Sequence, residues 1–169
     1  NHHNAAWGQY FAREFEDAAK SYRKVIADFP TYSFGYYGLS KVQRITGETR
    51  PAIIENSRSM ELMGNSIFSR LADAECLAAN GQRENAYSKV EDLEREGQNR
   101  FVSPYQLALV YSFLKENDKV IENLEKAFEI KESWLNWMGV DPAFDSVRGD
   151  ERFEAILEKV GYRPFFNSF

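Results

Sequence analysis

Few side chains of this sequence have the chemistry to bind a metal ion. His2 and His3 are adjacent near the amino end, and Cys76 is the single cysteine among 169 residues. Neighbouring residues on a helix point about 100° apart, and no carboxylate or second cysteine completes a ligand set around the two histidines. We therefore expect no metal site, and we expect both histidines to lie at an exposed chain end.

Cys76 would act as a nucleophile only if a neighbouring group stabilised its thiolate. The sequence places it between Ala74 and Leu77, with no His or Lys at helical spacing. A single cysteine also excludes an intramolecular disulfide framework. Packing in a helical core is therefore the expected role of Cys76.

Carboxylates that could serve acid and base catalysis gather in two segments, KVEDLERE at 89–96 and ENLEKAFEIKE at 122–132. They stand three or four positions from Lys or Arg, which is typical of solvated helix faces with modest ion-pair support. The sequence has no Gly-rich phosphate loop, no serine elbow and no paired Cys ligands. We expect a protein that is not an enzyme and that holds no cofactor.

The composition allows one sizeable core, because 43% of the residues are hydrophobic and 15% are aromatic. The net charge of −5 comes from interspersed acids and bases, so we expect no nucleic-acid binding by this segment. The most apolar stretch, Tyr105 to Leu114, is about half of the roughly 20 residues that a spanning helix needs. We expect no membrane segment, and we interpret a chain that starts at Asn1 as a piece of a longer protein. A cytoplasmic location is expected, with the periplasm as the alternative if an anchor lies outside the sequence.

The elements that position these side chains repeat with a period of 34 residues. Two series of small residues have this spacing, namely Ala18, Ala52, Ala86 and Val120, and Ala6, Ser40, Ala74 and Ala108. Two further series with the same spacing are Val25, Ser59, Leu93 and Ala127, and Tyr22, Asn56, Val90 and Leu124. Small residues on both helices of a hairpin let the two backbones approach closely. Gly47 and Gly81 stand where the first helix of a hairpin must stop.

This pattern resembles the tetratricopeptide repeat family. The resemblance implies an all-α fold in which antiparallel helix pairs stack into a right-handed superhelical solenoid. We place about four repeats over residues 1–134, with units at about 1–32, 33–66, 67–100 and 101–134. Arg13 and Lys115 stand where glycine is usual in the family, and Asp73 replaces a usual apolar residue.

Residues 135–169 are predicted to form a helical cap and an aromatic tail. A turn around Asp141 and Pro142 precedes a helix from about Asp150 to Val160, whose apolar residues share one face. The segment from Phe101 to Tyr162 resembles the carboxyl-terminal repeat region of bacterial multidomain regulators. In that group the array follows a winged-helix, serine/threonine kinase or cyclase-type domain, so the resemblance implies a sensing or protein-contacting appendage.

The family resemblance implies that the first helix of each unit lines a concave groove for a peptide or partner domain. Carried over, it predicts these groove residues: Trp7, Tyr10, Tyr37, Lys41, Arg44, Leu71, Glu75, Tyr105, Leu109 and Ser112. Aromatic and arginine side chains suit peptide recognition. The alternative for Tyr37 and Tyr105 is packing between repeats. The subset of the family that grips terminal carboxylates has Lys, Asn and Arg at fixed places, where this sequence has Phe34, Phe68 and Val102, then Gly38, Ala72 and Gln106. Such a grip is therefore not expected.

Two hypotheses for function remain at this point. The first is a non-catalytic module of a bacterial regulator that binds a protein or peptide in the groove. The second is a structural module that self-associates through its aromatic end and oligomerises attached domains. That end contains Trp134, Trp137, Met138, Phe144, Phe165, Phe166 and Phe169, which either cover the last repeat or contact a second chain.

Overall fold

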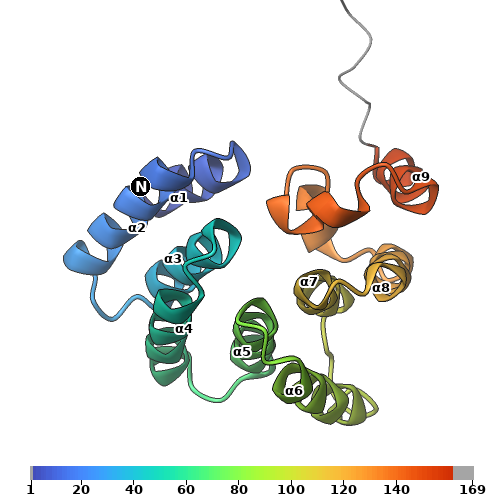
Figure 1. The fold of residues 1–169 in the computed structure, drawn as a ribbon, viewed down its shortest axis with the longest axis horizontal. Helices are drawn as coiled ribbons and strands as arrows, with labels where there is room; N and C mark the ends of the chain where they lie inside the picture. Colours follow the sequence, from blue (N-terminus) through green and yellow to red (C-terminus); the bar gives the residue numbers. More distant parts are fainter. Residues whose placement is uncertain (1, 162–169) are drawn as a thin grey trace, which may run out of the picture. The chain divides into compact units, whose positions relative to one another are not determined.

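The computed structural model describes residues 2–161, and every regular element in that range is helical (Figure 1). The elements are α1 (His2–Phe11), α2 (Phe15–Asp28), α3 (Ser33–Thr46), α4 (Thr49–Met63), α5 (Ile67–Ala79), α6 (Arg83–Glu96), α7 (Pro104–Leu114), α8 (Asn117–Glu129), the 3-10 helices η1 (Ser133–Trp137) and η2 (Pro142–Val147), and α9 (Glu151–Val160). The predicted all-α class is confirmed for these residues. None of these helices combines the length and the apolar character that a bilayer crossing requires.

Consecutive helices pack as adjacent pairs, α1 with α2, α3 with α4, α5 with α6 and α7 with α8. The two predicted series of small residues lie inside these pairs, and all eight side chains are 0% exposed. In the second pair the approach is close enough for Ser40 Oγ on α3 to donate a hydrogen bond to the backbone carbonyl of Ala52 on α4, at 2.8 Å. The repeated small residues thus set the helix contacts, as ridge-into-groove packing requires.

The chain divides into two compact units, residues 1–102 and residues 103–169. The first contains α1 to α6, and the second contains α7, α8, both 3-10 helices and α9. The division follows the third helix pair, whereas the sequence indicated a change of character at residue 134.

The turns inside the helix pairs have left-handed residues. Gly47 and Gly81 have φ of 84° and 76°, where glycine is least strained. Arg13 and Lys115 take the corresponding places with φ of 65° and 60°, so the missing glycines leave the turn geometry unchanged. Asp73, the other departure from the family pattern, forms an ion pair with Lys89 of the adjoining helix at 2.6 Å.

The second unit closes around a small aromatic core. Phe144 of η2 and Phe153 of α9 are both 0% exposed, with ring centroids 6.3 Å apart. Asp141 caps η2 by accepting a hydrogen bond from the backbone N–H of Ala143, so the predicted turn at Asp141 begins a 3-10 helix. The predicted last helix is α9, where Asp150 is the N-cap residue.

The predicted aromatic end is divided between packed and open side chains. Met138 is 0% exposed, and the Trp134 ring stacks on the Tyr105 ring with centroids 6.4 Å apart. Trp137 is 38% exposed. Phe165, Phe166 and Phe169 lie outside the described residues.

Candidate functional site

The structure buries nine of the ten side chains that the family resemblance placed in a groove. Trp7 is half-buried. The buried nine, each at most 7% exposed, are Tyr10, Tyr37, Lys41, Arg44, Leu71, Glu75, Tyr105, Leu109 and Ser112. These nine side chains are buried within the protein, so a partner could reach them only after a rearrangement. The concave groove that the family resemblance implies stays a prediction.

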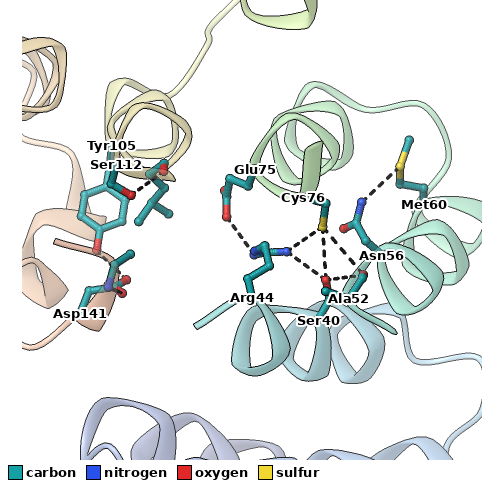
Figure 2. A network of polar contacts seen from close by, with 12 residues as sticks. Ser40, Arg44, Ala52, Asn56, Met60, Glu75, Cys76, Tyr105, Ser112 and Asp141 are labelled. Carbon is teal, nitrogen blue, oxygen red and sulfur yellow. Dashed lines mark hydrogen bonds and ion pairs between the residues drawn. The ribbon is translucent and has the colours of Figure 1, made fainter. Parts of the chain in front are cut away.

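The most highly connected of the nine is Arg44 on α3, at the centre of a buried polar network (Figure 2). Its Nη2 donates to Glu75 Oε2 at 2.8 Å, and its Nη1 donates to Cys76 Sγ at 3.1 Å and to Ser40 Oγ at 2.9 Å. The Arg44 and Glu75 side chains are 0% and 1% exposed. Because α3 and α5 belong to different helix pairs, this network joins the second pair to the third.

The neighbours of Arg44 favour the protonated, charged form of its guanidinium. Burial alone would lower the pKa of the guanidinium, but the nearby Cys76, Glu75 and Tyr37 raise it above its usual value. The Arg44 guanidinium contacts a carboxylate and a thiol and is closed to solvent, so a substrate has no access to it. We therefore interpret the network as a structural clamp, that is, a set of contacts that joins the second helix pair to the third.

Cys76 has a cationic neighbour that the sequence did not reveal. Arg44 lies 32 positions before Cys76, on another helix pair, so a search at helical spacing within α5 does not find it. The thiol is 1% exposed, which agrees with the predicted core position.

Other members of the predicted set also meet neighbours within their own unit. The Tyr37 ring contacts the Phe68 ring with centroids 5.0 Å apart, and Lys41 Nζ lies 5.0 Å from the centre of the Tyr10 ring. In the second unit the Tyr105 hydroxyl donates to Asp141 Oδ2 at 3.3 Å. These contacts favour the packing alternative for Tyr37 and Tyr105.

An open pocket instead lies in the first helix pair, and we call it the first-hairpin pocket. It is a cavity of about 430 Å³ lined by His2, His3, Val25, Phe29, Thr31 and Tyr32. Phe29 is 61% exposed and Tyr32 is 39% exposed, and the neighbouring Phe34 is 40% exposed. Large apolar side chains that gather in the open mark contact surfaces. The sequence interpretation named Val25 only as a member of a 34-residue series and did not include Phe29 or Tyr32, although aromatic residues on both sides of Pro30 were a usable signal.

His3 forms one wall of this pocket and is not part of a frayed end. Its ring lies 5.4 Å from the Tyr32 ring at 86° and stacks on Trp7 with centroids 6.3 Å apart. Burial lowers the pKa of the His3 imidazole below its usual value, so the ring is neutral at pH 7. His2 beside it is exposed, as predicted.

Behind the His3 wall lies a hydroxyl group whose hydrogen-bonding capacity is unused. Tyr22 is 1% exposed, its ring is 6.0 Å from the His3 ring, and its hydroxyl has no hydrogen-bond partner in the described part of the chain. Burial, and then the proximity of Tyr32, raise the pKa of the Tyr22 hydroxyl, so it keeps its proton. A buried hydroxyl of this kind gains free energy from any acceptor that reaches it.

Residues 2–161 contain no group of three His, Cys, Asp or Glu side chains arranged to hold a metal ion. No protein-family model and no curated protein matches the chain.

Proposed function

We propose that the chain is a non-catalytic helical repeat module of the tetratricopeptide type that binds a protein or peptide partner within a larger bacterial regulatory protein. The 34-residue period and the adjacent helix pairs support the repeat assignment. The observation that carries the binding function is the open first-hairpin pocket with its exposed aromatic rings.

Exposed aromatic side chains are the usual energetic centres of protein interfaces. Phe29 is 61% exposed, and burying such a ring against a partner removes apolar surface from water. The ion pair of Arg44 and Glu75 is sealed in the core instead. The open surface of the first unit is thus suited to contact with another molecule, while its buried charges serve the fold.

The predicted groove and the pocket share a boundary at Trp7. The Trp7 ring stacks on His3 at an interplanar angle of 20°, and His3 lines the pocket. The contact surface that we propose therefore runs from Trp7 across His3 to Tyr32. Of the buried residues in the predicted groove set, Tyr10 supports this surface, because its ring stacks on the Trp7 ring with centroids 6.4 Å apart.

Selection of peptides from a displayed library against the whole chain tests this function. We expect enriched sequences that bind as soluble peptides, saturably, with Kd at or below roughly 100 μM. Titration calorimetry at several peptide concentrations provides the measurement. A selection that yields no saturable binder would reject the proposal.

Self-association is the alternative function, and exposed apolar residues of the second unit favour it. Ile130 is 52% exposed, and Trp137 and Val140 are each 38% exposed. Sedimentation over a concentration series should then show a dimer that Trp137→Ala dissociates. A monomer at every concentration would exclude self-association by the chain.

A further inference from the structure

The turn that carries the two exposed rings of the first-hairpin pocket is held in place by hydrogen bonds. Phe29 N–H donates to the Val25 carbonyl at 2.8 Å, and Tyr32 N–H donates to the Phe29 carbonyl at 3.0 Å. The Tyr36 hydroxyl donates to the Pro30 carbonyl at 3.1 Å. A preorganised surface loses little conformational entropy when a ligand binds.

The lining of the pocket is uncharged. None of its six residues is Asp, Glu, Lys or Arg. Two of them are aromatic rings that stand open to solvent, Phe29 and Tyr32. An ionised group that entered would lose hydration without meeting an opposite charge. The lining therefore favours an uncharged occupant.

The buried Tyr22 ring lies behind the His3 wall. A Cβ atom at Gly38 would lie 2.1 Å from Tyr22 Cε1, so the Tyr22 ring rests directly on the α3 backbone and its position is fixed. The ring lies 6.0 Å from the His3 ring, which lines the pocket, whereas Tyr22 itself is not among the lining residues. The Tyr22 ring therefore supports the His3 wall of the pocket from behind.

We infer that the first-hairpin pocket binds one bulky aromatic side chain, Phe, Tyr or Trp, from an uncharged peptide segment of the partner. The inference rests on the proposed partner-binding function and names the chemistry of the partner. A cavity of about 430 Å³ lies within the usual size of ligand pockets, which runs from roughly 300 to 1,000 Å³. Aromatic walls around an aromatic guest allow edge-to-face contacts that add to the burial of apolar surface.

Two variants of the whole chain test the site with matched residue types. Phe29→Ala removes a pocket wall, and Phe101→Ala removes a comparably exposed ring outside the pocket, with 61% and 67% of the side chain exposed in the two cases. The probes are the library-selected peptides, each with its aromatic residue and with that residue changed to Ala or Lys. We expect Phe29→Ala to weaken binding by about tenfold or more and Phe101→Ala to leave it unchanged. Circular dichroism checks that both variants keep their helices.

The inference is overturned if the Ala and Lys peptides bind as well as the aromatic ones, or if Phe29→Ala binds like Phe101→Ala. In either case the partner-binding function stands, because the wild-type chain still binds peptides. If no peptide binds the wild-type chain, that function itself fails. Self-association that Phe29→Ala abolishes, without peptide binding, would also overturn the inference and assign the pocket to a second copy.

Discussion

Arg44 and Glu75 form a fully buried ion pair between two helices of the first unit, with Arg44 Nη2 2.8 Å from Glu75 Oε2. The guanidinium also donates to Cys76 and Ser40, so one cation joins α3 to α5. Removing one partner of such a pair leaves an uncompensated charge in the core, which is far less favourable than replacing both by apolar groups.

Replacing Arg44 alone should therefore destabilise the protein strongly. We expect Arg44→Met to lower the free energy of unfolding by about 3–5 kcal/mol, measured by urea denaturation, and Arg44→Met with Glu75→Leu to recover most of the loss. Arg58→Met is the control, because Arg58 pairs with Glu61 at 2.6 Å on the surface, where side chains are 48% and 64% exposed. An Arg44→Met loss no larger than that of the control would contradict the clamp.

Gly38 is predicted to tolerate no side chain, because a Cβ there would lie 2.1 Å from the Tyr22 ring. We expect Gly38→Ala to destabilise the protein by about 1–3 kcal/mol through overpacking between α2 and α3. Gly8→Ala is the matched control on α1, where a Cβ meets nothing within 4 Å. That substitution should stabilise the protein by about 0.5–1 kcal/mol, because Ala loses less backbone entropy in a helix. Thermal unfolding of both variants gives the comparison, and equal shifts would show that Tyr22 can move aside.

Lys115 ends α7 in a left-handed conformation, with φ of 60° and ψ of 34°. A non-glycine residue is strained there by about 1–2 kcal/mol, which exceeds the entropy that glycine adds to the unfolded chain. We expect Lys115→Gly to raise the free energy of unfolding by about 0.5–1 kcal/mol. Glu125→Gly, inside α8, should lower it instead. A destabilised Lys115→Gly variant would mean that the lysine side chain contributes more than the strain removes.

The helix pairs could be predicted from the sequence because their contacts repeat locally. Ala6 and Ala18 belong to one hairpin, and the same two places recur every 34 residues, so the period reports the packing directly. The burial of Arg44 could not be predicted in this way, since its partner Glu75 lies 31 residues away on another helix pair. A periodic pattern shows which face of its helix a residue occupies. It does not show how closely the first helices of neighbouring pairs, such as α3 and α5, approach each other.

The first-hairpin pocket was missed for a related reason. Its walls come from the start of α1 and from the segment around Phe29, which the fold brings together. Each segment alone has the composition of an ordinary helix end. The family resemblance predicts contact residues on the first helix of each unit. The open aromatic surface of the first unit lies instead in the turn between α2 and α3.

His3 should make stability depend on pH. Burial lowers the pKa of its imidazole in the folded protein below the usual value of 6.5, so the unfolded chain takes up the proton first as the pH falls. The stability due to neutral His3 is thus complete above about pH 6.5 and is lost as the pH falls from there through the lower folded pKa. Urea denaturation at pH 7.5 and 5.5 should show a larger drop for the wild type and for His2→Gln than for His3→Gln. Comparing the variants cancels the titration of other groups, including Glu55, whose pKa burial raises. An equal drop in all three proteins would show that His3 takes up its proton without disturbing the pocket.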